Sequence, residues 1–242
     1  MSKETLSMRE AKKILDESAR AVNAFEKKIE SGSEEFEKQI AVLWEDENAV
    51  RFIKTYWSNI RELLTVTENN YKIYATTVKD IAVAYAKAGG MQQIVVLETT
   101  LPGSIAAKAP TSIGKVQNHF PMSDEFGFIN IETGPDKCRD LLDEQISALY
   151  SISGEAAATL DGINAFGNQE VKQEINGFFK SILQNTMKVL TRMKPSCHQI
   201  ISSAAMTYKN TGEQAKEAPT TKTLPDGTEI TTIPRETPTG YY

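Results

Sequence analysis

The sequence is poor in the side chains that most catalytic and metal sites need. Its 242 residues include two histidines, His119 and His198, and two cysteines, Cys138 and Cys197. Two histidines in separate segments supply too few groups for a Ser-His-Asp triad or a histidine-rich metal site. The glycines form neither common phosphate-binding motif, G-x-x-x-x-G-K-[ST] or G-x-G-x-x-G. We therefore expect no enzymatic activity, no metal and no cofactor.

Long apolar runs and an excess of positive charge are also missing. No stretch reaches the about 20 apolar residues of a membrane span, and the segment Met1 to Ser7 is a polar start without a signal-peptide core. The net charge is −5, whereas nucleic-acid-binding domains usually carry a basic face. We expect no nucleic-acid partner. The chain is expected to be secreted or displayed at the cell surface by a route that needs no signal peptide, or otherwise to be cytoplasmic.

What the sequence has instead is helical periodicity. From Val50 to Tyr85, apolar residues recur at alternating intervals of three and four. This spacing keeps one side of a helix against a partner for about ten turns, because a helix turns once in ~3.6 residues. A second run with the same spacing extends from Leu15 to Leu43. The short segment between them allows only a tight reversal, so residues 8–88 are predicted to form an antiparallel helical hairpin.

The periodicity stops after residue 88 and resumes after residue 135. Residues 89–135 are rich in proline and contain two short β-like runs, Ile94–Leu97 and Phe126–Ile131, which predicts an insert or linker with short strands. Helical spacing returns over residues 136–210, which are predicted to form a second helical hairpin.

Two features distinguish the C-terminal half. Pro195 lies inside the last helical pattern, where proline removes a backbone hydrogen bond, and we expect a kink there. Residues 211–242 are rich in Thr, Pro and Gly, and Asp226-Gly227 within the segment Thr223–Ile230 indicates a small β-hairpin. Because a lone two-stranded hairpin is marginal in water, we expect a flexible tail.

Together these patterns predict an all-α fold, an elongated four-helix bundle made of two tandem antiparallel helical hairpins. The two hairpins also resemble each other at a shift of 122 residues, which places Ile53 on Ile175 and Trp57 on Phe179. We interpret the match as an internal duplication, in which the second hairpin supplies the partner that the first one needs. Chance alignment of two amphipathic hairpins is the alternative.

The turn of the first hairpin carries a family resemblance. Trp44-Glu45-Asp46, followed by Ala49 and Phe52, resembles the turn signature of the WXG family, small helical-hairpin proteins that are substrates of type VII (ESX) secretion in Gram-positive bacteria. Phe166-Gly167-Asn168 resembles a second copy. Neither copy has glycine in the third position, but aspartate and asparagine tolerate left-handed turn geometry better than most residues.

The resemblance implies a function in protein binding. Members of this family pair as antiparallel dimers into four-helix bundles, a place that the second hairpin could take within this chain. The implied partners are a component of the secretion machine or a second WXG-like chain, and a homodimer is an alternative. The candidate turn and partner-binding residues are Trp44, Asp46, Phe52, Trp57, Phe166 and Asn168. For the turn aromatics, plain hydrophobic packing is the alternative role.

A C-terminal export signal is a further feature of the family, a tyrosine followed four residues later by an acidic residue. Here Tyr208 is followed at that spacing by Gly212, with Glu213 one position later. Tyr208 and Glu213 are the candidates for a variant signal, and core packing of Tyr208 is the alternative.

The two cysteines lie at similar distances from the predicted Phe166 turn. Counted along the hairpin at about 1.5 Å per residue, Cys138 and Cys197 come within roughly 5 Å of the same height. A disulfide between them and two free thiols are both compatible with this spacing, and the spacing alone does not require the disulfide.

Two other functions remain alternatives to a WXG-like export protein. One is an α-helical pore-forming toxin in which residues 91–133 act as a membrane tongue, although Lys108, Lys115, Asp124 and Glu125 dilute the apolarity of this segment. Membrane contact is expected under this alternative alone. The other is a structural assembly component.

Overall fold

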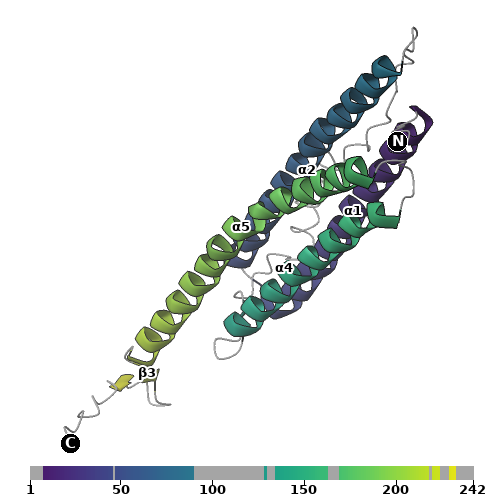
Figure 1. The fold of residues 1–242 in the computed structure, drawn as a ribbon. Coiled ribbons are helices and arrows are strands. Elements are labelled where there is room, and N and C mark those ends of the chain that lie inside the picture. Colours follow the sequence, from purple (N-terminus) through teal and green to yellow (C-terminus); the bar gives the residue numbers. More distant parts are fainter. Residues whose placement is uncertain are drawn as a thin grey trace, which may run out of the picture.

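The computed structural model describes residues 8–45, 47–89, 128–129, 134–162, 169–217, 220–223 and 229–232. Four long helices dominate these residues (Figure 1): α1 (Met8–Leu43), α2 (Glu47–Ala88), α4 (Gly134–Ala158) and α5 (Gln169–Glu217). A short 3-10 helix, η2 (Thr159–Gly162), continues α4. The predicted all-α four-helix bundle is confirmed. At 1.5 Å per residue, the 42 residues of α2 extend for about 63 Å, so the bundle is elongated.

The four helices form a closed square in which each helix packs on two neighbours. Helix α1 packs on α2 and α4, and helix α5 packs on α2 and α4. Hydrogen bonds from Asn48 to Tyr208 and from Asn70 to Thr186 show that α2 and α5 run antiparallel. The second hairpin is therefore inverted relative to the first, and it packs along the face that the first hairpin could not bury alone.

The long seam of α2 packs as its spacing predicts. Its central residues are buried, including Ile53, Trp57, Ile60, Leu64, Tyr71, Tyr74 and Val78. The one polar member, Thr67, is buried as well, and its hydroxyl donates a hydrogen bond to the Leu63 carbonyl at 2.8 Å. A side chain that satisfies its own hydroxyl on the preceding helical turn can occupy the seam without leaving a buried polar group unpaired.

Two small antiparallel sheets flank the bundle. Strand β1 (Trp44–Glu45) pairs with β2 (Phe128–Ile129), which lies inside one of the two β-like runs of the insert. The other run, 94–97, is outside the described residues. Strand β3 (Thr220–Thr223) pairs with β4 (Glu229–Thr232) on either side of Asp226-Gly227, so the predicted C-terminal β-hairpin is present.

Helix α5 is longer than predicted. The change in composition after Asn210 suggested an end near that residue, but the helix continues through Glu217. It is also continuous across Pro195, next to which Ser196 Oγ donates a hydrogen bond to the Arg192 carbonyl at 3.1 Å. In Figure 1, α5 extends past α4 toward the C-terminus.

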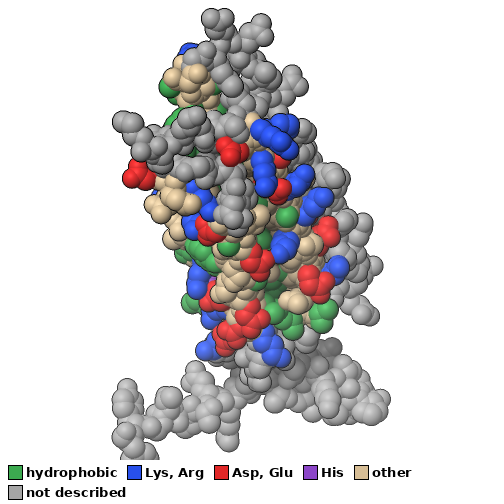
Figure 2. Space-filling view, turned by 45° about the vertical axis from the view of Figure 1, so that its right-hand side comes forward, with side chains coloured by type: hydrophobic (Ala, Val, Ile, Leu, Met, Phe, Trp, Pro, Cys, Tyr) green, Lys and Arg blue, Asp and Glu red, His purple; other side chains and the backbone are tan. Residues whose placement is uncertain are grey.

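The exposed surface is dominated by charge. Figure 2 shows acidic and basic side chains intermingled over the described part of one face, with apolar side chains scattered between them. Ion pairs between exposed side chains, such as Lys28 of α1 with Glu155 of α4, join neighbouring helices at the surface. Among the helices that the structure describes, none is both long enough and apolar enough to cross a membrane.

Candidate partner-binding end of the bundle

The turn between α1 and α2 is closed by aromatic packing. Trp44 is fully buried, and its ring centroid lies 5.7 Å from that of Phe52 in the second turn of α2. Phe52 in turn lies 6.2 Å from Phe36, which is 4.6 Å from Tyr56. The backbone at Trp44 pairs with that at Ile129. The turn aromatics therefore cap the interior of the hairpin and shape this end of the bundle from within.

Trp57, the other tryptophan among the candidate partner-binding residues, lies deeper in the same hairpin. It is buried, and its indole Nε1 donates a hydrogen bond to the Glu37 carboxylate on α1. An indole N–H that is removed from water needs such an acceptor. With Trp44, Phe52 and Trp57 all buried, none of the three offers its side chain directly to a partner in this structure, and a binding role for them remains a prediction.

A polar network behind the aromatic cap ties three helices together. The Tyr56 hydroxyl on α2 donates to Ser33 Oγ on α1 at 2.9 Å and accepts a hydrogen bond from Gln145 Nε2 on α4, also at 2.9 Å. Burial raises the pKa of Tyr56, so this hydroxyl remains a donor over the physiological range. The network fixes the position of the inverted hairpin relative to the turn.

Tyr208, the tyrosine of the candidate export signal, lies at the same end of the bundle. It is partly buried, and its hydroxyl accepts a hydrogen bond from Asn48 Nδ2 at 3.2 Å. Asn48 belongs to the first turn of α2, four residues after Trp44. The fold thus brings the turn of the first hairpin together with the C-terminal part of the second. Glu213 lies on α5, five residues beyond Tyr208.

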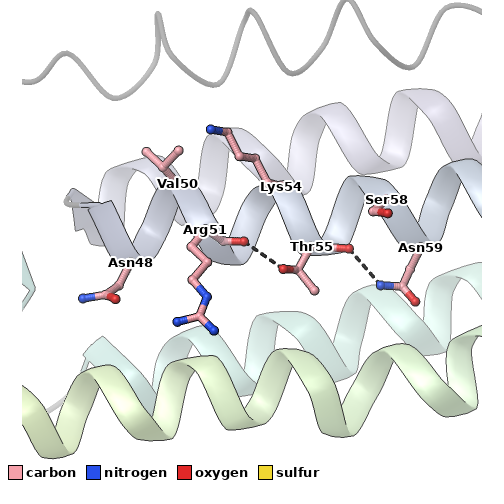
Figure 3. Close-up of a pocket in the computed structure, with 7 residues that line it drawn as sticks. All are labelled: Asn48, Val50, Arg51, Lys54, Thr55, Ser58 and Asn59. Carbon is pink, nitrogen blue, oxygen red and sulfur yellow. Dashed lines mark hydrogen bonds between the residues drawn. The ribbon is translucent and has the colours of Figure 1, made fainter.

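Two hollows flank α2 next to this contact. The first, of about 420 Å³, lies between α2 and α5, and we call it the Arg51 groove; its lining includes Asn48, Arg51 and Thr55 of α2 and Ser196, Gln199 and Ser203 of α5. The second, of about 690 Å³, shares these three α2 residues and adds four more from α2, which are Val50, Lys54, Ser58 and Asn59. In Figure 3, Arg51 extends toward α5 while Lys54 points to the opposite side of α2.

Some predicted residues cannot be placed. Asp46, Phe166 and Asn168 lie outside the described residues, and so does most of the 91–133 segment on which the pore-forming alternative depends. The predicted second turn therefore stays untested.

The two cysteines are free thiols, and both are buried. Hydrogen bonds from Arg139 to Ser202 and between Asp143 and His198 set the register of α4 and α5, which places Cys138 level with residue 203. Cys197 lies six residues away, or about 9 Å along the axis, too far for a disulfide. The estimate from the sequence failed because it centred the hairpin on Phe166, whereas these contacts place Cys138 level with residue 203. Burial raises the pKa of both thiols to about 12, which keeps them protonated.

The polar residues that line these hollows were not predicted from the sequence. They recur on α2 at helical spacing, opposite the apolar seam, at Asn48, Arg51, Thr55 and Asn59. This spacing alone does not indicate a site, because it is typical of any solvated helix face. This polar face differs from other solvated faces because Tyr208 and Ser203 of α5 lie against it. These residues are more than 140 positions away along the chain, so no local sequence pattern predicts the contact.

The described residues hold no group of three or more His, Cys, Asp or Glu side chains arranged to bind a metal ion. Compared with known proteins, the chain matches no protein-family model, no curated protein and no solved structure.

Proposed function

We propose that this chain is a WXG-like helical protein that acts by binding other proteins in a bacterial type VII (ESX) secretion system, as a secreted substrate or an export-associated component. The proposal depends on the bundle end at which the α1–α2 turn and the C-terminal part of α5 meet.

The hydrogen bond between Asn48 and Tyr208 is the observation that carries this proposal. The resemblance assigns one recognition feature to the turn at Trp44 and another to the tyrosine near the end of the last helix. In a single hairpin these features would sit far apart, because the last helix runs away from the turn. Inversion of the second hairpin brings Tyr208 to the turn, where a single partner could contact both elements.

The internal repeat gives further support. The buried residues Ile53, Trp57 and Ile60 of the first hairpin correspond, at the 122-residue shift, to the buried residues Ile175, Phe179 and Ile182 of the second. Equivalent positions therefore face the same core, as expected if two hairpins of one ancestral kind pair within one chain.

An export assay tests the proposal. The tagged chain is produced in a Gram-positive strain with an active type VII system and in the same strain without it, and its amounts in the medium and in the cells are compared. We expect the chain in the medium of the active strain alone. Tyr208→Ala should lower export by roughly tenfold, the size expected when one interface residue worth about 1.4 kcal/mol is lost.

Tyr150→Ala is the matched control, because Tyr150 is a partly exposed tyrosine on α4 with 46% of its surface accessible. It should leave export unchanged, and thermal unfolding should show that both variants are folded. Equal amounts of the unmodified chain in the medium of both strains would contradict the proposed function.

A further inference from the structure

Two carboxyl side chains meet in the interface between α1 and α2. Trp57 of α2 donates its indole N–H to Glu37 of α1, and this contact marks how the two antiparallel helices are aligned. Glu26 lies eleven residues, or about three turns, before Glu37, and Glu68 lies eleven residues after Trp57. Equal steps along antiparallel helices bring Glu26 and Glu68 to the same level. One contact therefore holds a donor and an acceptor, whereas the equivalent contact three turns away holds two acceptors.

Neither carboxyl group has a donor among the residues that the structure describes. Glu26 is fully buried, and both of its oxygens lack a hydrogen-bond partner. Glu68 is partly buried, and its Oε1 is buried without a partner as well. Arg61 lies two turns before Glu68 on α2, but its buried Nε and Nη2 form no hydrogen bond either. Because a buried carboxylate without a donor is costly, this contact needs a proton.

The other charges around Glu26 do not supply the missing donor. On α1 itself, Lys27 is exposed and Glu30 is a further acid. On the other flank of α1, the charged residues Glu155 of α4 and Asp161 of η2 are paired with Lys28 and Lys180. Burial, and next the charge of Glu68, raise the pKa of Glu26 to about 8. Glu68 is therefore the neighbouring charge to which Glu26 responds.

We propose that Glu26 and Glu68 share one proton in the folded chain, and that this proton-dependent contact keeps α1 closed on α2. The acid form of one carboxyl group donates its O–H to the carboxylate of the other, so one proton satisfies both side chains. Loss of this proton to the solvent leaves two like charges in a buried interface, which favours opening of the hairpin. This inference is independent of the proposed function, since it follows from the packing of α1 on α2.

Carboxyl NMR of the full chain tests whether the proton is shared. The chain is produced with ¹³C at the side-chain carboxyl carbon of glutamate, and the two signals are identified by their absence in Glu26→Gln and Glu68→Gln. We expect both signals to follow the same two steps as the pH is raised, because strongly interacting groups titrate as a pair. In Glu68→Gln, Glu26 should titrate in a single step at a pH lower by roughly one unit or more.

Hydrogen exchange tests whether the proton keeps the hairpin closed. Protection factors of the α1 and α2 amides near the two residues are measured at pH 6 and pH 9. In the unmodified chain they should fall by at least roughly tenfold, because the folded pair holds a proton that the open chain has lost. In Glu26→Gln or Glu68→Gln an amide N–H takes the place of the shared proton, so protection should change by less than about twofold.

The matched control is Glu62→Gln, which removes the charge of an exposed glutamate on α2. It should lose protection as the unmodified chain does, and thermal unfolding at pH 6 checks that all three variants fold. Independent single steps for Glu26 and Glu68, or equal losses of protection in the three variants, would overturn the inference. So would a loss of protection at pH 6 when EDTA is added, which would assign the contact to a bound metal ion.

Discussion

The interface inside the first hairpin and the interface between the two hairpins are built differently. Where α1 meets α2, α1 buries four polar or charged residues, Ser18, Glu26, Ser33 and Glu37. Most of them meet a matching group, as when Ser33 accepts a hydrogen bond from Tyr56 and Glu37 accepts one from Trp57. Such pairs fix the register, because a shift by one turn would leave each buried polar group without its partner.

Where α2 meets α5, ring contacts lie at the centre of the interface, beside the hydrogen bonds of Asn48 and Asn70. The Tyr74 ring centroid lies 5.2 Å from that of Phe179 and 5.9 Å from that of Phe178. The charged contact at this interface, Glu62 with Arg192, is exposed. Burial of aromatic rings stabilises an interface through the apolar area removed from water, but it specifies the register of the helices less strongly than paired polar groups do. Buried polar matching is therefore concentrated inside the first hairpin, while the α2–α5 interface depends more on apolar area, with the hydrogen bond from Asn70 to Thr186 as a polar contact across it.

The largest effect is expected from the interface between the hairpins. Phe179→Ala removes a fully buried ring and leaves a cavity beside Tyr74, so the free energy of unfolding should fall by about 3–5 kcal/mol. Phe179→Leu keeps most of the apolar volume and should cost less than about 1.5 kcal/mol. Urea unfolding of both variants measures the difference. Similar costs for the two would mean that ring packing does not dominate this interface.

Inside the hairpin, Tyr56→Phe tests the polar network. The substitution keeps the ring but leaves Ser33 and Gln145 without the hydroxyl that joins them, which should cost about 1–3 kcal/mol. Tyr150→Phe, at a half-exposed site, should cost less than about 0.5 kcal/mol in the same urea unfolding measurement. If Tyr56→Phe were equally mild, the network would not contribute to stability.

Glu26 should make the hairpin interface sensitive to pH. Burial, and next the nearby charge of Glu68, raise the pKa of Glu26 from 4.5 to about 8. The folded chain therefore keeps a proton that the unfolded chain loses above pH 4.5, so this contribution to stability declines as the pH rises toward 8. Glu26→Gln cannot ionise, and it should be more stable than the unmodified chain by roughly 1–2 kcal/mol at pH 9.

Urea unfolding at pH 5 and pH 9 measures this effect. At pH 5 the two proteins should differ little, since Glu26 is protonated in the folded state of one and replaced by a neutral amide in the other. Glu68→Gln provides a second check, because loss of the nearby charge should lower the pKa of Glu26 and move the decline to lower pH. A stability gap that does not change with pH would contradict the assignment.

The smallest effect is expected at the exposed ion pair between the hairpins. Arg192 Nη2 lies 2.6 Å from Glu62 Oε1, but the side chains are 68% and 45% exposed. Solvent screening limits the coupling to about 0.2–1 kcal/mol. A double-mutant cycle with Glu62→Ala and Arg192→Ala measures it. Coupling well above that range would show that charge, as well as ring packing, holds the hairpins together.

The helical pattern was readable from the sequence because it is local and repeated. The seam from Val50 to Tyr85, the reversal near Trp44 and the Asp226-Gly227 hairpin all follow from short-range spacing and turn chemistry. The pairing of β1 with β2 could not be predicted, because these strands are two residues long and lie far apart in the chain. The register of α4 on α5 could not be counted from Phe166, because the hydrogen bonds between these helices are not centred on that residue.

The candidate site was predictable in part. Trp44, Phe52 and Tyr208 were identified as residues of interest, but their roles as inner cap and as acceptor for Asn48 depend on the inverted packing of the second hairpin. The sequence indicated only a polar helix face at the position of the Arg51 groove, because the second wall of the groove comes from α5. Local patterns therefore located the elements, and tertiary packing created the surface between them.

In this structure the second hairpin completes the bundle of the first within the same chain. Light scattering with small-angle X-ray scattering at low micromolar concentration tests it most directly. We expect a mass of 26.8 kDa that does not change with concentration, and an elongated particle. An obligate dimer of twice that mass would contradict it, because the hairpins would then pair between chains.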